Sequence, residues 1–488
     1  MASINGTEDD DTLTGTANGD LINGFAGNDV ISGNGGADTI IGGMGDDFID
    51  VSFGAASVSG GAGNDRFHLS GISSGFPDTV FDGGAGVDTF DASSVSAGPN
   101  FLFFRDSEET AGSFTVADNI VSGVETVIGG SGPNWFLLQY AIAAVTLHGS
   151  DASDVFRTSF DHADVMFGYG GNDDMSLRPG DRAYGGSGDD RFDFWISGTG
   201  YADGEQGIDT LDLGFGWEID LAAGTAESPI DAEVYTFSNV ENVIVYAWMG
   251  YDSSAFGDEG NNLFSVNPLF NDGSAGVLFD GRGGNDTLSG SMAGDTLDGG
   301  GGLDWADYAG STSKVVVDLL SSGNNEGDAR GDTYTSIENL RGSDFGDALR
   351  GDNFANRIDG LTKADALSGR DGRDTLAGGA GGDKLTGGEG NDRFELASLD
   401  ADDADKILDF GSGADRIALD GDAFGLNRVK PSQFVVGSAA GDANDRLIYD
   451  SATGKLFFDA DGTGAAAQVL IARLSDSPAL SAGDFVVI

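Results

Sequence analysis

Isolated apolar residues recur at every ninth position near both ends of the chain. Each stands two residues after an acid or an asparagine and lies between glycine-rich segments. One inward-pointing side chain with outward-pointing neighbours is the pattern of a very short strand. The positions are Leu13, Ile22, Ile31, Ile40 and Ile49 in the first block, and Leu349, Ile358, Leu367, Leu376, Leu385 and Phe394 in the second.

A nonapeptide unit is too small to bury its own apolar residue, so it must stack on copies of itself. We interpret each unit as a six-residue turn followed by a strand of about three residues. Two successive units then form one flat coil with a turn at each edge. Successive coils stack at about 4.8 Å. The predicted fold is all-β: a parallel β-roll or β-solenoid with β-rich spacers and a C-terminal β cap.

The acids occupy one position of the repeat, so equivalent aspartates on one edge lie about one strand spacing apart. Two bare carboxylates at that separation repel by about 3 kcal/mol at an effective dielectric constant of 20. A divalent cation between them reverses the sign. Calcium accepts six to eight oxygens, including the backbone carbonyls that an open glycine turn exposes. Each unit is therefore expected to be half of a calcium site, which the unit two places along completes.

The predicted metal-ligating side chains are Asp11, Asp20, Asp29, Asp38, Asp47, Asp65, Asp88, Asp154, Asp173, Asp190, Asp209, Asp286, Asp295, Asp304, Asp347, Asp365, Asp374, Asp383 and Asp392. The predicted carbonyl ligands are those of Gly24, Gly33, Gly42, Gly43, Gly45, Gly60, Gly61, Gly63, Gly185, Gly186, Gly188, Gly369, Gly378, Gly379, Gly381, Gly387, Gly388 and Gly390.

Charge supports a cationic partner. The chain has 81 acidic and 24 basic residues, a net charge of −57, so a nucleic-acid partner is not expected. It has no cysteine, which excludes disulfides and zinc–thiolate sites. No apolar run is long enough for a transmembrane segment, and the start of the sequence, "MASINGTEDDDTL", lacks the pattern of a cleaved secretory signal.

Two stretches, residues 42–49 and 387–394, fit the nonapeptide GGxGxDxUx in full, and in-phase units surround both. This pattern resembles the RTX (repeats-in-toxin) family of bacterial secreted proteins. The resemblance implies multiple bound calcium ions and an extracellular location.

The middle of the chain is predicted to carry acids on one edge only. Asp154, Asp173, Asp190 and Asp209 recur at close to twice the nonapeptide spacing, and Ala163, Arg182 and Thr199 stand halfway between them. The corresponding core positions are predicted at Val165, Tyr184 and Tyr201, and Arg182 is expected to supply a replacement charge. After Asp47, the position of the next acid holds Ala56, followed by a core residue at Val58.

Spacers without the nonapeptide separate the blocks. Their glutamates, Glu125, Glu241 and Glu338, are interpreted as ligands, caps or ordinary turn residues. Strands are expected near Ile219 and Val316. The predicted segments are a β-roll over 1–92, a spacer over 93–148, a one-edged roll over 149–214, a spacer over 215–256, a roll over 257–308, a spacer over 309–341, a roll over 342–396 and a cap over 397–488.

The C-terminal segment is predicted to form strands with a hairpin at Thr453–Gly454, and so to cover the open end of the solenoid. It resembles the C-terminal part of serralysin-type RTX proteins, including an acid followed by four apolar residues at 484–488. That resemblance implies export by a type I secretion machinery from a Gram-negative bacterium, without a cleaved N-terminal signal.

An enzymatic activity is not indicated by motifs, since the sequence has neither HExxH nor GxSxG. His148 and His162 flank two acids, but surface or strand roles are the simpler interpretation. Tryptophans gather in the middle at Trp135, Trp195, Trp217 and Trp248. The sequence thus favours a secreted calcium-binding protein with a surface, matrix or adhesion role. A second interpretation is a protein that binds or acts on extracellular polysaccharide through this aromatic section.

Overall fold

The computed structural model describes residues 1–51, 57–70, 79–95, 100–105, 120–139, 144–158, 162–194, 198–228, 233–411 and 415–488. Within them the protein is nearly all β, with α1 (Gly421–Phe424) as a single short α-helix. The chain divides into two compact units. Unit 1 comprises residues 1–214 and 223–243, and unit 2 comprises 215–222 and 244–488.

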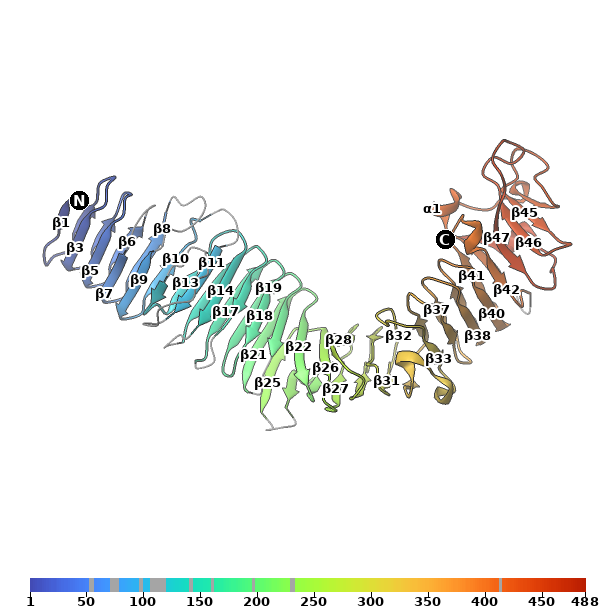
Figure 1. The fold of residues 1–488 in the computed structure, drawn as a ribbon, viewed down its shortest axis with the longest axis horizontal. Helices are drawn as coiled ribbons and strands as arrows, with labels where there is room; N and C mark the ends of the chain where they lie inside the picture. Colours follow the sequence, from blue (N-terminus) through green and yellow to red (C-terminus); the bar gives the residue numbers. More distant parts are fainter. Residues whose placement is uncertain are drawn as a thin grey trace. The chain divides into compact units, whose positions relative to one another are not determined.

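Unit 1 is a stack of parallel coils, in which each coil contributes one strand to each of two sheets (Figure 1). The first sheet contains β1 (Ser3–Asn5), β3 (Leu21–Ala26), β5 (Thr39–Met44), β7 (Ser57–Ala62), β9 (Val80–Ala85), β12 (Ile120–Ser122), β11 (Asn100–Arg105), β14 (Asn134–Gln139), β16 (Val155–Arg157), β18 (Asp174–Leu177), β20 (Arg191–Phe194) and β22 (Thr210–Phe215).

The second sheet of unit 1 contains β2 (Thr12–Thr14), β4 (Val30–Ser32), β6 (Phe48–Val51), β8 (Arg66–Leu69), β10 (Thr89–Asp91), β13 (Thr126–Ile128), β15 (Thr146–Ser150), β17 (Val165–Gly170), β19 (Arg182–Ser187), β21 (Gly200–Gln206), β25 (Val234–Ser238) and β24 (Thr225–Glu227). Leu21 pairs with Thr39 and Val30 with Phe48, so strands within the regular repeats pair with the strand two nonapeptides further along the chain. The predicted coil of two nonapeptides is confirmed.

The core is two facing columns of apolar side chains, one from each sheet. Ile22, Ile40 and Val58 form part of one column, while Ile31 and Ile49 form part of the other, and all five are at most 1% exposed. Burying a side chain of this size stabilises the fold by about 1.5–3 kcal/mol. Because every unit adds only one such residue, stability accumulates along the stack.

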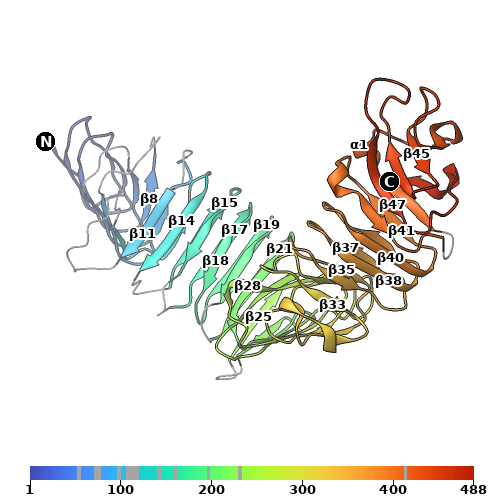
Figure 2. The ribbon, with the colours of Figure 1, turned by 45° about the vertical axis from the view of Figure 1, so that its right-hand side comes forward.

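Unit 2 has the same architecture over its repeats (Figure 2). One sheet contains β26 (Asn242–Ala247), β28 (Leu263–Asn271), β30 (Thr287–Leu288), β32 (Trp305–Asp307), β35 (Asn339–Arg341), β37 (Arg357–Asp359), β39 (Thr375–Ala377), β41 (Arg393–Leu396), β43 (Arg416–Leu419) and β48 (Phe485–Val487). Facing strands are β23 (Glu218–Asp220), β27 (Ser253–Phe256), β29 (Val277–Asp280), β31 (Thr296–Asp298) and β34 (Thr333–Thr335), then β33 (Val316–Asp318), β36 (Ala348–Arg350), β38 (Ala366–Gly372), β40 (Lys384–Gly390) and β42 (Asp405–Ile407).

The last part of unit 2 closes the stack as predicted. β45 (Leu447–Asp450) and β46 (Lys455–Phe458) form an antiparallel hairpin, with Gly454 at a φ of +69° in its turn. β47 (Val469–Leu474) then pairs with β42, and β48 pairs with β43. Both sheets of the final coil therefore gain a covering strand. β44 (Phe434–Val436) completes this segment.

The prediction for the core of the middle section is wrong by one residue. Met166, Ala183 and Ala202 are fully buried there, whereas Val165, Tyr184 and Tyr201 are partly exposed. A shift of one residue turns every side chain of a strand to its other face. Val58 is buried as predicted, while Ala56 lies outside the described residues.

The same shift places acids on the edge that was expected to lack them. Asp164 and Asp181 are buried, and the Asp164 N–H donates to Asp181 Oδ1 at 2.8 Å. Arg182, the residue after Asp181, begins β19 and has an exposed side chain. The replacement charge expected from it therefore does not lie in the row of buried aspartates. The prediction of a one-edged middle section is wrong at these two positions.

Candidate calcium-binding loops

Aspartates of successive coils are linked to one another through their backbones. Asp47 Oδ1 accepts a hydrogen bond from the Asp29 N–H at 2.8 Å, and the Asp47 N–H donates to Asp65 Oδ1 at 2.9 Å. Asp47 is therefore linked to the loops of Asp29 and Asp65, which lie two nonapeptides before and after it, the spacing predicted for the two halves of a site. The same bond recurs along unit 2, for example from the Asp347 N–H to Asp365 Oδ1 at 2.7 Å. One carboxylate oxygen of each aspartate is thus engaged in stacking the coils.

The second oxygen, Oδ2, divides the predicted aspartates other than Asp209 into two classes. In the first class it is buried and has no hydrogen-bond partner among the described residues. The members are Asp29, Asp38, Asp47, Asp65, Asp88, Asp173, Asp190, Asp286, Asp304, Asp365, Asp374, Asp383 and Asp392. A buried carboxylate oxygen without a partner is costly, unless a cation is bound to it.

In the second class a neighbouring Ser or Thr satisfies Oδ2. Asp20 Oδ2 accepts from the Thr16 N–H at 2.8 Å and from the Thr16 hydroxyl at 2.7 Å. Asp347 Oδ2 accepts in the same way from Ser343, at 2.6 and 3.0 Å. The other members are Asp11, Asp154 and Asp295, which bind the N–H groups of Thr7, Ser150 and Ser291.

The backbone of the second loop residue separates these classes. That residue lies four positions before each aspartate, and it has a positive φ in every loop of the first class. We call these the left-handed loops; their second residues are Phe25, Asn34, Gly43, Gly61, Gly84, Tyr169, Gly186, Arg282, Gly300, Leu361, Arg370, Gly379 and Gly388, and Glu205 before Asp209 is a further case. Residues in this conformation are mostly glycine or asparagine, because a side chain at positive φ is strained.

We call the loops of the second class the capped loops; their second residues are Thr7, Thr16, Ser150, Ser291 and Ser343, and none has a positive φ. Asn262 and Asn356 replace aspartate in two further loops in which the N–H of the second residue, Asp258 or Asp352, donates to the Asn Oδ1. Asparagine suits this position because its Oδ1 can accept the backbone N–H just as a carboxylate oxygen does.

Each loop opens with a glycine that leaves room beside the free oxygen. A Cβ added to Gly42 would collide with Asp47 Oδ2 and with the carbonyl oxygen of Gly60 in the next coil. A Cβ on Gly360 would likewise meet Asp365 Oδ2 and the carbonyl oxygen of Gly378. The space is therefore bounded by one carboxylate oxygen and one carbonyl oxygen from adjacent coils. These are the oxygen donors that calcium prefers.

Further carbonyls face the neighbouring loop. The carbonyl oxygen of Gly43 lies against Gly61, and that of Gly45 lies against Gly63. The carboxylates themselves are spread along the rows. In the described part of the chain, no group of three or more His, Asp or Glu side chains that could hold a metal is found. Backbone carbonyls would thus supply part of the coordination.

Burial without a counter-ion raises the pKa of the carboxylates in left-handed loops. Desolvation is the largest cause, and adjacent aspartates add to it. The pKa rises to about 7 for Asp65 and to about 8 for Asp173 and Asp365. The capped loops are mixed: the hydrogen bond from the Thr16 hydroxyl lowers the pKa of Asp20, whereas burial raises the pKa of Asp154 and Asp295. In the left-handed loops the ionised carboxylate is therefore disfavoured in the folded state unless a cation lies beside it.

The spacer glutamates continue the rows. The Asp88, Asp209 and Asp304 N–H groups donate to Glu125, Glu241 and Glu338 at 2.7, 2.9 and 2.9 Å. Asp332, Asp405 and Asp415 hold the same place after Asp295, Asp383 and Asp392. These three aspartates were not predicted from the sequence, although Asp405 and Asp415 stand two residues before the buried Ile407 and Ile417.

A family model for the RTX calcium-binding nonapeptide repeat matches residues 5–40, 24–55, 41–71, 278–306, 341–376 and 359–394. The chain carries RTX calcium-binding repeats. These ranges contain many of the left-handed loops, including those of Asp47 and Asp365. No curated protein matches the chain. None of the helices within the described ranges has the length and apolar character to span a lipid bilayer.

The aromatic middle section forms a ladder on the outer face of one sheet. The rings of His148, Phe167 and Tyr184 stack with centroids 5.1 and 5.0 Å apart, and Tyr201 meets Tyr184 at 5.9 Å. His148 Nδ1 also lies 2.7 Å from the Tyr169 hydroxyl. The stacked rings cover one another's faces, so mainly their edges point to solvent. Trp135 and Trp248 are partly exposed, Trp217 is buried, and Trp195 lies outside the described residues.

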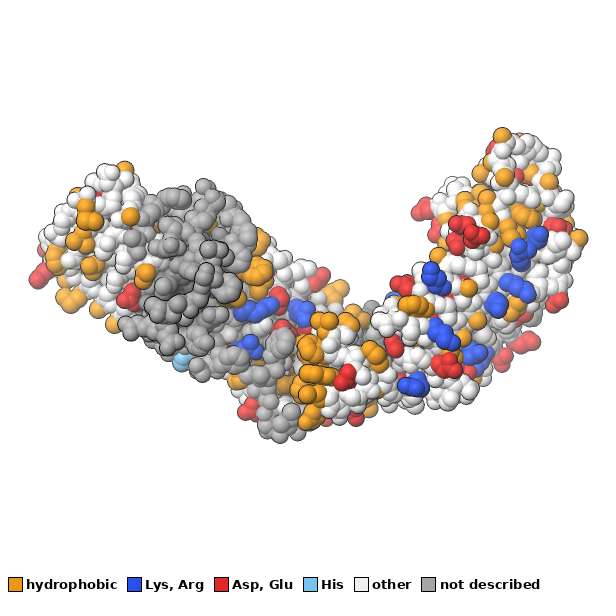
Figure 3. Space-filling view, viewed as in Figure 1, with side chains coloured by type: hydrophobic (Ala, Val, Ile, Leu, Met, Phe, Trp, Pro, Cys, Tyr) orange, Lys and Arg blue, Asp and Glu red, His pale blue; other side chains and the backbone are white. Residues whose placement is uncertain are grey.

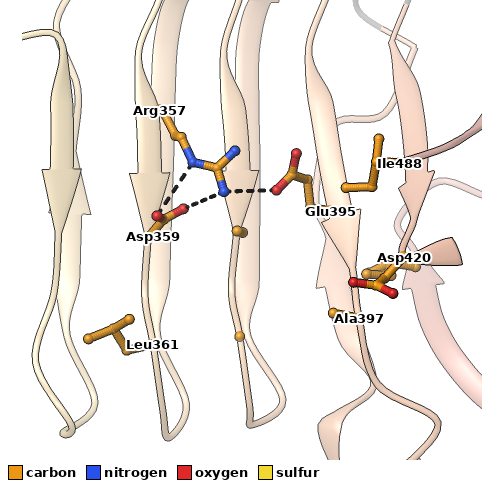
Figure 4. Close-up of a pocket in the computed structure, with 10 residues that line it drawn as sticks. Arg357, Asp359, Leu361, Glu395, Ala397, Asp420 and Ile488 are labelled. Atoms are coloured by element: carbon orange, nitrogen blue, oxygen red, sulfur yellow. Dashed lines mark hydrogen bonds and ion pairs between the residues drawn. The ribbon is translucent and has the colours of Figure 1, made fainter. Parts of the chain in front are cut away.

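A pocket of about 290 Å³ lies between β37, β41 and the C-terminal residue of unit 2 (Figure 4). Its arginine, Arg357, bonds to Asp359 and Glu395, each at 3.0 Å. The carboxylate of Asp420 accepts the N–H groups of Asp422 and Ala423 at the start of α1. Because the charged groups that line it are already paired, this pocket offers little to a ligand.

Proposed function

We propose that the protein folds outside the cell by binding calcium in its left-handed loops. The observation that carries the proposal is the buried, unpartnered Oδ2 of the aspartate in every left-handed loop except that of Asp209. In several loops, including those of Asp47 and Asp365, this oxygen lies beside a carbonyl of the next coil. The protein is a calcium-binding RTX-type protein. The proposal adds which loops bind the ion and what the binding does.

The proposed ligands are the aspartates of the left-handed loops, including Asp209, and the carbonyls of the glycines that face them. Asp11, Asp20, Asp154, Asp295 and Asp347 are not proposed as ligands, because Ser or Thr already supplies their hydrogen bonds. Asp181 is also excluded, since its Oδ2 accepts from the Thr158 hydroxyl at 2.6 Å.

Calcium would act as a folding switch. Inside a cell calcium is scarce, and repulsion along the acidic rows disfavours the compact state. At millimolar concentrations outside, weak extracellular-type sites fill and stabilise the folded state by mass action. The resemblance of the C-terminal segment to that of serralysin-type proteins supports type I secretion from a Gram-negative bacterium. A surface, matrix or adhesion role fits a stacked protein of this charge.

Circular dichroism with calcium and with a chelator tests the folding switch. We expect strand signal in millimolar calcium, loss of that signal on chelation, and recovery when calcium is restored. Magnesium at the same concentration is the matched control, because it demands a smaller octahedral site. Strand signal that persists under full chelation would refute the proposal.

Binding of acidic polysaccharide is a second candidate function. The stacked ladder argues against sugar stacking on ring faces at that site. A pocket of about 550 Å³ in unit 2 is lined by Arg373, Arg393 and Arg416. Basic side chains lie among acidic ones on the face of unit 2 in Figure 3. Binding of a carboxylated glycan that is lost in Arg393→Gln would favour this candidate, and equal binding by the variant would exclude this pocket.

A further inference from the structure

Two arginines of unit 2 occupy the same position in two separate left-handed loops. Arg282 is the second residue of the loop that ends at Asp286, with a φ of +63°. Arg370 is the second residue of the loop that ends at Asp374, with a φ of +80°. An arginine side chain at positive φ is unusual and needs a compensating interaction.

Both guanidinium groups reach back past the preceding loop and make the same set of bonds. Arg282 donates from Nη1 to the Gly257 carbonyl at 2.9 Å and to Asp220 Oδ1 at 2.8 Å, and from Nη2 to Asp220 Oδ2 at 2.7 Å. Arg370 donates from Nη1 to the Gly351 carbonyl and from Nη2 to both oxygens of Asp318 at 2.8 Å. Each arginine therefore binds one carbonyl and one carboxylate.

Like the oxygens that bound the calcium-binding space elsewhere, these acceptors are one carboxylate and one loop carbonyl. Beside Asp365, that space lies between a carboxylate oxygen of one coil and the carbonyl of the glycine that opens the next loop, Gly378. Gly257 and Gly351 are also loop-opening glycines, and Asp220 and Asp318 belong to the preceding coils. Asp220 and Asp318 directly follow the core residues Ile219 and Val317, so they do not hold the ligand position two residues before the core. At both places the guanidinium group lies between a carboxylate oxygen and a carbonyl oxygen.

Both arrangements lie where a spacer meets the first loop of a repeat block on that edge of the stack. The preceding coil is β23 in one case and β33 in the other, and both are spacer strands. Among the described residues, the coil before Gly257 or Gly351 has no left-handed loop on that edge that could supply an aspartate to bind calcium. The first loops on these edges, residues 257–262 and 351–356, end in Asn262 and Asn356, whose amides add no charge.

We propose that Arg282 and Arg370 are built-in cations that take the place of calcium where two spacers join their repeat blocks. This inference rests on the proposed function, since it assumes that calcium fills the left-handed loops that follow. Each junction would then dock without calcium, so that the metal-dependent stack grows from a coil that is already in register.

An ordinary surface ion pair is the competing explanation, and isolated exposed pairs contribute little. Three features argue against it: each carboxylate receives two bonds, each arginine also binds a loop carbonyl, and the same arrangement occurs twice. The Asp318 side chain is only 6% exposed and that of Arg370 is 24% exposed. Loss of such a charged bond would leave the carboxylate and the carbonyl unsatisfied.

Substitution of arginine by glycine gives the sharpest test, because Gly379 and Gly388 hold the same position at positive φ in neighbouring loops. The full-length Arg370→Gly variant would be compared with Leu361→Gly, which makes the matched change in the loop before Asp365. The readouts are the number of calcium ions bound at saturation and hydrogen exchange of residues 316–318 and 348–356. Arg282→Gly repeats the test on residues 218–220 and 253–257.

We expect junction amides of Arg370→Gly to exchange about tenfold faster or more at calcium concentrations that saturate the wild type. Additional calcium should slow this exchange again, with one more ion bound per chain. Leu361→Gly should change neither the junction exchange nor the number of ions. Junction exchange equal to that of Leu361→Gly would overturn the inference, and so would faster exchange that added calcium fails to slow. A wild-type protein that binds no calcium would instead refute the proposed function.

Discussion

Asp347 and Asp365 are adjacent in one row of unit 2 and offer a matched pair of substitutions. The Asp347 N–H donates to Asp365 Oδ1, and the Asp365 N–H donates to Asp383 Oδ1. Asp365 belongs to a left-handed loop with an unpartnered Oδ2, whereas Ser343 satisfies Asp347. We predict that Asp365→Asn and Asp347→Asn differ in how their effects depend on calcium.

The expected magnitudes follow from these contacts. One calcium site filled at ten times its dissociation constant stabilises the folded state by about 1.4 kcal/mol, and Asp365→Asn should remove one site. Asparagine keeps an oxygen for the Asp347 N–H, so little else is lost. Without calcium the same change removes an unneutralised buried charge and should stabilise the protein, so the sign of its effect reverses.

Asp347→Asn should destabilise equally with and without calcium. The carboxylate accepts from the N–H groups of both Val315 and Ser343, and an amide has only one acceptor oxygen. Loss of one bond to a charged group costs about 1.5–3 kcal/mol. Hydrogen exchange of β36 and β38 in calcium and under partial chelation measures both effects. A calcium-dependent loss in Asp347→Asn, or none in Asp365→Asn, would refute the division into two loop classes.

Three further predictions concern pH, a glycine and the aromatic ladder. Burial raises the pKa of Asp65 and Asp190 to about 7, so protonation favours the folded state. Without calcium, the free energy of unfolding should be greatest in acid and should fall as the pH rises from about 4 to above 7. Denaturant melts that show the reverse would contradict this. Gly43→Ala should destabilise by more than about 1 kcal/mol, since Gly43 has a φ of +128° and a Cβ would collide with the Phe25 carbonyl; an unchanged denaturation midpoint would exclude that reason. Phe167→Ala should cost about 1–3 kcal/mol by removing its ring contacts, among them those with His148 and Tyr184. Hydrogen exchange in β15 and β19 should then be faster, and unchanged exchange would show that the ladder does not stabilise the sheet.

The regular nonapeptide spacing was sufficient to predict the stacked coils and the buried column at Ile22, Ile31 and Ile40. The alternation of strands converts such spacing directly into geometry. Where the spacing departed from a multiple of nine, the same rule misplaced the middle core by one position, and Asp164 and Asp181 were missed. Counting residues along the chain does not show at which residue each strand of the middle section begins.

The chemistry of individual loops depended on features that the repeat hides. Thr16 and Phe25 hold equivalent positions, yet one donates to its aspartate and the other adopts a positive φ. A hydroxyl at that position is the sequence signal for a capped loop. The partners of the Arg370–Asp318 and Arg282–Asp220 bonds are far apart in the sequence, so only the fold brings them together.

A crystal structure of the calcium-loaded protein, with anomalous scattering to locate the ions, would show which loops bind calcium. We expect calcium beside the aspartates of left-handed loops, such as Asp47 and Asp365, bound also by a loop carbonyl of the next coil. We expect no calcium beside Asp20 or Asp347. Calcium bound to a capped loop, or loops at Asp47 and Asp365 that hold none at saturating calcium, would contradict this expectation.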